Sequence, residues 1–382
     1  MYSRNWLCID QTDFSSNSIG GIRSFLDSII KFSETNRFSA VGLSSNKTLK
    51  IGDWVTIEIE GVRVKFLPVG RTKGTKVNFL PNSLILILGL IRFRKEVKVA
   101  AKDNLVNVHR LEIAFALIVL FFVRPILFLH NSRLQLTMSS SSSRWKYFPI
   151  LIKFLEFFVL RNVKVLILLS RKEYERLKNI SVPNFHIQTW YDSKIFHYRR
   201  NILNDNIRLL WVGRLEDEKN PLFLLDIAEE LQRRGIRFHL TVIGDGSLSS
   251  KLKKLTESKI LSSSFTLTGS LPKRDVANHL ANADTLIMTS HYEGSSITLK
   301  EALACGVPVI LNRDSDPDEN IKFGVNGFVI EKNNVNAYVQ SILKVRSITP
   351  QDCSNSVNNF RGSIQVPSMI SQVSKLIEAT IR

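Results

Sequence analysis

The sequence is poor in cysteine and has no apolar run long enough to cross a bilayer. Its three cysteines, Cys8, Cys305 and Cys353, are scattered through 382 residues without the spacing of a metal site. A disulfide framework is therefore not expected, and we infer a reducing compartment. The longest apolar run, residues 113–123, has 11 residues, whereas a membrane-spanning helix needs about 20. With no signal peptide recognisable at residues 6–10, we expect neither a transmembrane helix nor export, and a cytoplasmic location.

Acidic residues are scarce in the first half of the chain. Residues 1–200 contain 31 Lys and Arg against 14 Asp and Glu, a net charge of +17, whereas residues 201–382 contain 21 against 20, a net charge of +1. A one-sided basic half indicates a polyanionic partner, either nucleic acid or anionic lipid head groups. A generally basic composition without any such partner is the alternative.

The length of the chain predicts more than one domain, because 382 residues exceed one ordinary core. Strand-like and helix-like segments alternate through both halves, which predicts an α/β protein with two parallel sheets. We place an N-terminal domain at residues 1–200 and a C-terminal domain at residues 201–364. Residues 365–382 are expected to form a final helix.

Residues 284–310 read as strand, loop, helix and strand. In the loop, Ser295 or Ser296 can cap the following helix, and Gly306 fits the residue after its end. Ligands of open α/β sheets bind at the carboxyl ends of the strands, and a helix N-terminus at that point favours phosphate. Glu293 in the loop and Glu301 in the helix could accept hydrogen bonds from the paired hydroxyls of a sugar or ribose, although isolated glutamates of this kind are more often solvated surface charges.

A second candidate site follows the strand expected at residues 207–212. The loop Gly-Arg-Leu-Glu-Asp-Glu-Lys-Asn-Pro places Arg214 and Lys219 on either side of three acidic residues. Two cations directed at one diphosphate can stabilise the negative charge that builds up on a departing nucleotide. A solvated charged loop is the structural alternative.

In the first half, Gly20 and Gly21 lie between the first expected strand and a helix. Glycine lets the backbone approach a phosphate closely, although a glycine pair also marks ordinary turns. His109 and His130 each follow an expected strand, at the edge where ligands bind. A lone histidine is usually structural, but two in equivalent positions indicate a site.

The run E-G-x-x-x-x-x-x-E-A-x-A-x-G-x-P-V-I, from Glu293 on, resembles the signature of the retaining glycosyltransferases of family four. The blocks G-R-x-x-x-x-K-N-P, G-D-G at Gly244 and N-G-x-V-I are similar to others of that family. The resemblance implies a GT-B fold, in which two Rossmann-like parallel-sheet domains face each other across a cleft. It also implies that the final helix packs back on the N-terminal domain.

The resemblance also implies roles for individual residues. Glu293 would contact the donor sugar, Glu301 would hold the ribose hydroxyls, and Arg214 and Lys219 would hold the donor phosphates. A histidine at one of the two strand tips would touch the sugar or acceptor. The implied donor site comprises Gly20, Gly21, Arg214, Lys219, Gly244, Gly269, Glu293, Gly294, Ser295, Ser296 and Glu301. The implied catalytic groups are Glu293, Arg214, Lys219, His109 and His130.

We therefore expect a retaining glycosyltransferase that transfers a hexose-type sugar from a nucleotide-diphosphate sugar to an acceptor hydroxyl. The resemblance implies that no cofactor or metal is needed, because the family usually works without metal. The basic first half favours a lipid-linked saccharide acceptor in surface-polysaccharide assembly. It also favours peripheral contact with the anionic inner face of a membrane, rather than nucleic acid. The alternatives are a soluble acceptor, a nucleotide-sugar epimerase and a non-enzymatic binder of polyanions or membranes.

Overall fold

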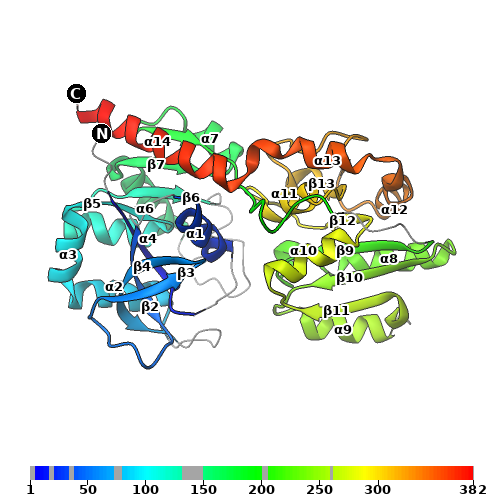
Figure 1. The fold of residues 1–382 in the computed structure, drawn as a ribbon, viewed down its shortest axis with the longest axis horizontal. Coiled ribbons are helices and arrows are strands. Elements are labelled where there is room, and N and C mark those ends of the chain that lie inside the picture. Colours follow the sequence, from blue (N-terminus) through cyan, green and yellow to red (C-terminus); the bar gives the residue numbers. More distant parts are fainter. Residues whose placement is uncertain are drawn as a thin grey trace. The chain divides into compact units, whose positions relative to one another are not determined.

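The computed structural model of the chain describes residues 5–16, 21–33, 38–72, 80–130, 149–199, 205–258 and 261–381. These residues form two compact units (Figure 1). The first holds the described residues of Met1–His130, Tyr147–Ile187 and Val366–Arg382, and the second holds those of Gln188–Gln365. The chain enters the second unit at Gln188, before the boundary expected at residue 200, because Tyr191 and Phe196 are buried in the second core.

The first unit is built on a sheet with the strand order β3-β4-β2-β1-β5-β6-β7-β8. Its strands are β1 (Asn5–Asp13), β2 (Phe38–Ser44), β3 (Val55–Ile59), β4 (Val62–Arg71), β5 (Asn104–Val108), β6 (Ile126–Leu129), β7 (Val165–Leu168) and β8 (Asn184–His186). Every pair is parallel except β3 with β4, which form an antiparallel hairpin. Strands β6 and β7 are buried along their whole length, as expected of a sheet covered on both faces.

Helices connect these strands and cover the sheet. They are α1 (Gly21–Phe32), α2 (Asn82–Arg92), α3 (Arg94–Lys102), α4 (Leu111–Ala116), the π-helical turn η1 (Leu117–Phe121), α6 (Pro149–Asn162), α7 (Arg171–Leu177) and α14 (Gly362–Ile381). Helix α14 belongs to the first unit from Val366 on. No described helix is long and apolar enough to span a bilayer.

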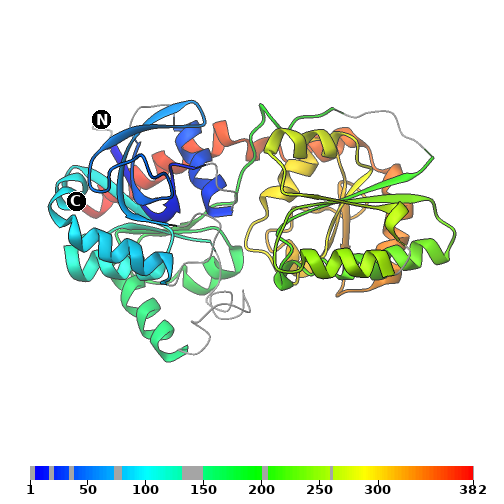
Figure 2. The ribbon, with the colours of Figure 1, turned by 90° about the horizontal axis from the view of Figure 1, so that it is seen from below.

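The second unit has an all-parallel sheet with the order β11-β10-β9-β12-β13-β14. Its strands are β9 (Ile207–Val212), β10 (Phe238–Ile243), β11 (Phe265–Gly269), β12 (Thr285–Met288), β13 (Val309–Asn312) and β14 (Gly327–Ile330). Its helices and short helical turns are η3 (Asp217–Lys219), α8 (Phe223–Arg233), α9 (Ser249–Ser258), η4 (Ser262–Ser264), α10 (Lys273–Ala281), α11 (Ile297–Ala304), η5 (Arg313–Ser315), α12 (Val335–Lys344), η6 (Val345–Ser347), α13 (Pro350–Ser356) and η7 (Asn358–Phe360). Figure 2 shows helices on both faces of this sheet.

The strand order places a topological switch point in each sheet. In the second unit the chain runs outward from β9 to β10 and β11, then returns to place β12 on the other side of β9. In the first unit, β2 and β5 lie on opposite sides of β1. The loops that follow the two central strands diverge at such a point, which leaves a crevice for ligands at the carboxyl edge. The two parallel-sheet units predicted from the sequence are therefore confirmed.

Candidate active site

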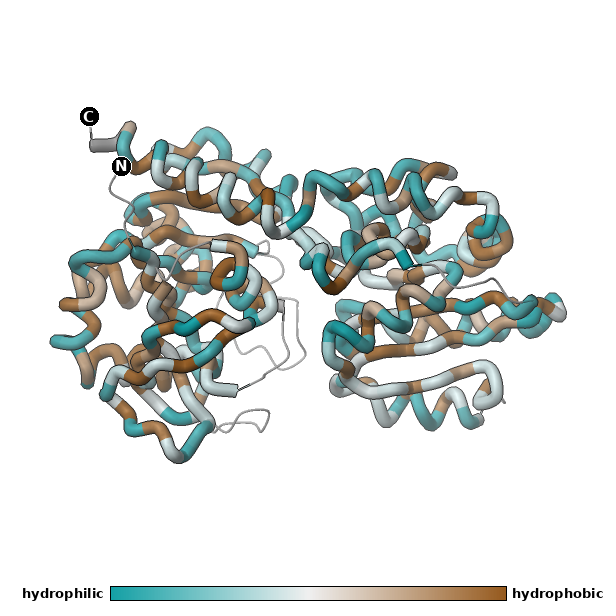
Figure 3. The backbone as a smooth tube through the Cα atoms, viewed as in Figure 1, coloured by the Kyte–Doolittle hydropathy of each residue, from teal (hydrophilic) through white to brown (hydrophobic). Residues whose placement is uncertain are grey.

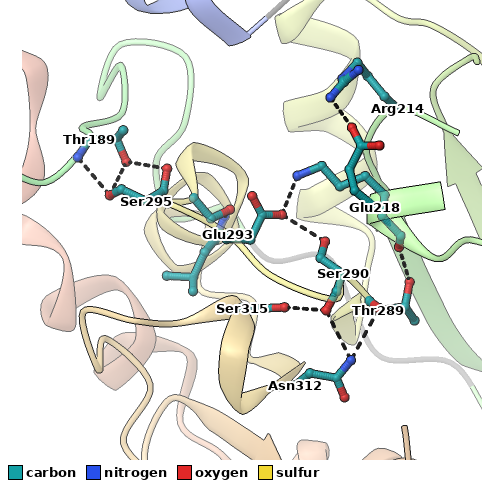
Figure 4. A network of polar contacts seen from close by, with 12 residues as sticks. Thr189, Arg214, Glu218, Thr289, Ser290, Glu293, Ser295, Asn312 and Ser315 are labelled. Carbon is teal, nitrogen blue, oxygen red and sulfur yellow. Dashed lines mark hydrogen bonds and ion pairs between the residues drawn. The ribbon is translucent and has the colours of Figure 1, made fainter. Parts of the chain in front are cut away.

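In the second unit, the loops after β9 and β12 flank the switch point of the sheet. The first loop carries Arg214 and Lys219, and the second carries Glu293. The Lys219 ammonium group lies 2.5 Å from Oε1 of Glu293, although 74 residues separate the two in sequence. Ser290 donates a hydrogen bond of 2.9 Å to the same carboxylate oxygen (Figure 4). The structure thus brings together a cation and a carboxylate that sequence reasoning assigned to one site.

Arg214 lies beside this pair without joining it. Its guanidinium group forms an ion pair with Glu218, four residues further along the loop (Figure 4). The Arg214 side chain is 62% exposed, whereas those of Lys219 and Glu293 are 21% and 14% exposed. Arg214 is therefore available to an anion arriving from solvent. Lys219 is already held in place.

The backbone of both loops is fixed by buried hydrogen bonds. Trp211 donates from Nε1 to the Thr289 hydroxyl at 3.0 Å, and that hydroxyl donates to the Lys219 carbonyl at 2.8 Å. Asn312, at the end of β13, donates to the carbonyls of Thr289 and Ser290 at 3.3 Å each (Figure 4). The position of the ion pair is therefore set by three neighbouring strands rather than by the loops alone.

Glycines let the loops after β9, β10 and β11 approach one another. Gly244 has φ of +140°, and a Cβ there would lie 1.8 Å from the Gly213 carbonyl oxygen. Its own N–H donates to the Gly269 carbonyl at 2.9 Å. Gly269 has φ of +72°, and a Cβ added there would meet no atom within 4 Å. Gly244 is thus required by close backbone contact, and Gly269 by its left-handed conformation alone.

The loop before α11 has the cap that the sequence predicted. Ser296 is the N-cap, and its hydroxyl accepts the N–H of Leu299 at 3.3 Å. Ser295 has a different role, because its hydroxyl lies 3.0 Å from that of Thr189 and accepts the Thr189 N–H at 3.1 Å (Figure 4). Gly294, between Glu293 and these serines, is buried. The loop is therefore tied both to its own helix and to the segment that enters the second unit.

Lys300 is a further candidate site residue, which sequence reasoning did not identify. It is fully buried within α11, and its ammonium group lies 3.3 Å from the Thr189 hydroxyl and 3.4 Å from that of Ser295. Burial lowers the pKa of Lys300 to about 8, and the nearby carboxylates of Asp318 and Asp316 oppose this shift. The available signal was a lysine on the side of an otherwise apolar helix that faces the core.

Glu301 lies further along α11, apart from the Lys219–Glu293 pair. Its charged neighbours are Lys273, at the start of α10, and Asp192. Burial raises the pKa of Glu301 to about 7, Lys273 lowers it and Asp192 adds to the increase. Glu301 is therefore poised between its protonated and ionised forms near neutral pH. Within the described part of the chain, no hydrogen bond joins it to Arg214 or Lys219.

In the first unit the two strand-tip histidines lie in direct contact. Nδ1 of His109 is 2.8 Å from Nε2 of His130, so one ring donates and the other accepts. The His109 ring stacks on Phe128, with centroids 4.8 Å apart, and Phe25 of α1 contacts both histidines edge-on. Burial lowers the pKa of His109 to about 3, aided by Arg110, and lowers the pKa of His130 well below its ordinary value. Both rings are therefore neutral at physiological pH.

Buried polar atoms that make no hydrogen bond among the described residues occur near this histidine pair, at the switch point of the first sheet. Oδ2 of Asp10, Nδ2 of Asn107, Nε2 of His109 and Nε of Arg110 are buried and accept or donate no hydrogen bond among the described residues. Oδ2 of Asp10 and Nε of Arg110 form a long ion pair of 4.0 Å with each other, so Asn107 and His109 carry the atoms with no partner of either kind among the described residues. Buried polar groups are normally paired, so this edge is chemically suited to a ligand with several hydroxyl groups. Sequence reasoning found the histidines here but not Asp10 or Asn107.

The glycine pair of the first unit can be placed only in part. Gly21 is the first residue of α1, whereas Gly20 lies outside the described residues. No group of three or more metal-ligating side chains occurs in the portion of the chain that the structure describes.

Comparison with known proteins relates this geometry to a family. Residues 193–359 match the family described as "Glycosyl transferases group 1". The amylovoran biosynthesis glycosyltransferase AmsK of Erwinia amylovora is 28% identical over 152 residues, which is 38% of this chain and 37% of that protein. The UDP-Gal:alpha-D-GlcNAc-diphosphoundecaprenol alpha-1,3-galactosyltransferase of Escherichia coli is 27% identical over 156 residues, 39% of this chain and 40% of that protein. The chain thus aligns with less than half the length of these curated relatives.

Solved structures resemble the chain over nearly its whole length. Sucrose-phosphate synthase from Thermosynechococcus elongatus has a TM-score of 0.77 at 16% identity, covering 99% of this chain and 100% of that one. Anabaena HepE in complex with UDP and glucose has a TM-score of 0.66 at 15% identity, covering 99% and 98%. Together with the two parallel sheets, this likeness confirms the GT-B fold.

Proposed function

We propose that the chain is a retaining glycosyltransferase, and the match of its residues 193–359 to the glycosyl transferases group 1 family supports this. It would transfer a hexose-type sugar from a nucleotide-diphosphate sugar to an acceptor hydroxyl. The observation that carries this proposal is the Lys219–Glu293 pair, with Arg214 beside it, at the switch point of the second sheet. A switch-point crevice with two cations and a carboxylate fits a pyrophosphate attached to a polyol.

The chemistry follows from where charge develops. Breaking the bond between the anomeric carbon and the donor oxygen leaves negative charge on the β-phosphate. Arg214 and Lys219 would stabilise this charge, and the N-terminus of α11 would add its dipole. Glu293 would orient the sugar through its hydroxyls, and Glu301 would hold the ribose. The acceptor hydroxyl then attacks on the face that the phosphate leaves, and the phosphate oxygen takes its proton, so that the configuration is retained.

We further propose that the acceptor is a lipid-linked saccharide in surface-polysaccharide assembly. Two relatives support this: one is named for amylovoran biosynthesis, and the other acts on a diphosphoundecaprenol-linked sugar. The unpartnered polar atoms around His109 and His130 would receive the acceptor's hydroxyls. The chain would then work in the cytoplasm, at the inner face of the membrane, with its basic first unit against anionic lipid. No metal is required in this scheme, so turnover should survive a chelator.

A thermal-shift panel of UDP-, GDP- and ADP-sugars tests the donor site. A donor at 100 times its dissociation constant should add about 2.7 kcal/mol of stability. We expect Arg214→Ala, Lys219→Ala and Glu301→Ala each to abolish the shift that the correct donor produces. Lys251→Ala and Lys253→Ala, which alter exposed side chains of α9 in the same unit, are the matched controls.

Two outcomes would contradict the proposal. If none of the three site variants loses the shift, the donor does not bind at this crevice. If the anomeric proton of the product, observed by NMR, shows the opposite configuration to that of the donor, the enzyme is inverting.

A further inference from the structure

Apolar side chains are exposed on three neighbouring helices of the first unit. The apolar patch, as we call it, consists of Leu84, Leu88 and Ile91 of α2, Val119 and Leu120 of η1 with the following Phe122, and Ile150, Leu151, Phe154 and Phe157 of α6. Phe122 and Ile150 are 82% and 81% exposed. Single exposed apolar residues are ordinary, but a set of this size on adjacent elements marks an interaction surface.

The three helices form one layer. Helix α4, which continues into η1, contacts both α2 and α6. The chain crosses the sheet in one direction from β4 to β5, then to β6 and then to β7. Right-handed crossovers therefore keep the connecting helices α2, α4 and α6 on one face. Their outward sides therefore belong to a common surface. Figure 2 shows α6 (green) projecting from the side of the first unit.

The spacing shows that this exposure is built into the helices. Leu84, Leu88 and Ile91 lie at i, i+4 and i+7 on α2, and Ile150, Phe154 and Phe157 repeat that pattern on α6. This is the stripe that a surface helix normally turns toward the core. Helix α6 has another apolar side for that purpose, with Ile152, Val159 and Leu160 buried. Figure 3 shows α2 as mostly brown, in keeping with its apolar sequence.

The exposed charges around the apolar patch are mainly positive. The exposed cations on these helices, on α3 and after η1 are Arg92, Arg94, Lys95, Lys98, Lys102, Arg124, Lys153 and Arg161. In contrast, Glu96 and Glu112 are only partly exposed, and Glu156 is buried in an ion pair with Arg176. Among the described residues of this layer, one acidic side chain is exposed, that of Asp103 directly after α3. The surface thus offers apolar contacts and positive charge together.

We propose that this layer docks on an anionic phospholipid bilayer, with the apolar patch inserted at the level of the head groups. Cations beside an inserted apolar stripe match a surface of anionic lipid, and a helix of 14 residues such as α6 lies in the interface rather than spanning it. A protein partner would need acidic groups to match these cations and would bury them at greater cost.

The orientation of α6 connects this surface to the acceptor site. A helix that leads into a parallel strand runs opposite to it, so the N-terminal end of α6 lies toward the carboxyl edge of the sheet. Ile150 and Leu151 are at that end, and His109 and His130 end strands at the same edge. A lipid held beside α6 would therefore present its head group toward the histidine pair. The docking surface deepens the peripheral membrane contact proposed above and rests on that proposed function.

Vesicle flotation of the full chain tests the proposal. The vesicles are phosphatidylcholine alone, or phosphatidylcholine with 30% phosphatidylglycerol. The patch variants are Ile150→Ser/Phe154→Ser/Phe157→Ser and Lys95→Glu/Lys98→Glu. The matched controls in the second unit are Phe323→Ser/Leu343→Ser and Lys251→Glu/Lys254→Glu, which change side chains that are also exposed. We expect the chain to float with the anionic vesicles, each patch variant to lose at least tenfold in partitioning, and the controls to float like the wild type.

Other outcomes would overturn the proposal. Patch variants that float like the wild type, or equal binding to neutral vesicles, would exclude docking of this kind. A dimer in sedimentation that the serine variant disperses, without vesicle binding, would make the patch an interface between copies. The donor's thermal shift separates the two proposals. The patch variants should still show the donor's thermal shift. If the wild-type chain floats with the vesicles but shows no thermal shift with any donor, the donor site is refuted and the docking surface is not.

Discussion

Replacing Lys300 with methionine should make the protein more stable at neutral pH. Lys300 is fully buried, and burial lowers its pKa from 10.5 to about 8. At about 1.4 kcal/mol per pKa unit, the folded chain disfavours the charged lysine by about 3 kcal/mol. Methionine is close to neutral lysine in length and volume and carries no charge to desolvate.

The hydrogen bonds of Lys300 offset only part of this cost. They measure 3.3 and 3.4 Å, and a typical hydrogen bond contributes about 1 kcal/mol net. The two hydroxyls that they reach, those of Thr189 and Ser295, lie 3.0 Å apart and remain bonded to each other in the variant. Neither is left unpaired, so we expect a net gain of about 1–2 kcal/mol at pH 7.

The sign of the pH dependence separates this explanation from a simple packing effect. Because the folded pKa lies below the unfolded one, the cost is fully present below pH 8 and disappears as the pH rises toward 10.5. The wild type should therefore gain stability between pH 8 and 10, and Lys300→Met should not. Urea unfolding followed by tryptophan fluorescence measures both, with Trp190 and Trp211 reporting on the second unit.

Exposed Lys251→Met on α9 is the matched control and should change stability at no pH. A variant less stable than the wild type at pH 7, or a difference that stays constant up to pH 10, would refute the reasoning. The buried charge of Lys300 destabilises the protein, but its electric field would favour donor phosphates bound at the start of α11. We therefore expect Lys300→Met to bind the donor more weakly while being more stable.

Three further predictions follow from the site. Burial raises the pKa of Glu301 to about 7, so the free energy of unfolding of the wild type should fall as the pH rises from 4.5 to 7. Glu301→Gln should not show this pH dependence, and in urea unfolding at pH 8 it should be up to about 3 kcal/mol more stable than the wild type. Since the pKa of His109 is about 3 and that of His130 is also depressed, neither ring should titrate between pH 5 and 8 in NMR spectra; a midpoint near 6.5 would show that the pair is solvated. Gly244→Ala should cost at least about 3 kcal/mol in thermal unfolding, because its Cβ would meet a backbone oxygen, whereas Gly269→Ala, which has only an unfavourable φ, should cost about 1 kcal/mol.

The parts of the site that the sequence predicted depend on local rules. A serine before an apolar helical segment predicts a cap, and Ser296 is that cap. Residues after consecutive parallel strands are expected at one edge, which is why Lys219 and Glu293 could be assigned to one site across 74 residues. The histidines at two strand tips were identified by the same rule.

The missed features depend on tertiary contacts that have no local pattern. Thr189 bonds to Ser295 across 106 residues, and nothing near either residue indicates the pairing. The burial of Lys300 depends on which segment covers α11. Helix α6 is apolar on more than one side, so its periodicity predicts a helix but not which face is exposed. The boundary expected at residue 200 follows from the polar, charged composition of residues 198–206, and no local pattern shows that Tyr191 and Phe196 before it pack in the second core.

The Lys219–Glu293 pair can be tested as a unit, because each charge compensates the other. The side chains are mostly buried, so removing one leaves the other without its partner, and partly buried pairs of this kind are coupled by about 1–3 kcal/mol. We expect Lys219→Met and Glu293→Gln each to destabilise the protein, and the double variant to be less destabilised than the sum of the two. In the proposed donor complex these partners would be exchanged, with the phosphates bound to Lys219 and the sugar hydroxyls bound to Glu293. Ser290 keeps its hydrogen bond to Glu293, and Thr289 keeps the Lys219 backbone, so the exchange needs no movement of the loops. Additive single effects in a urea-unfolding cycle would show that the two charges are independent, and they would remove the reason for assigning them to one donor.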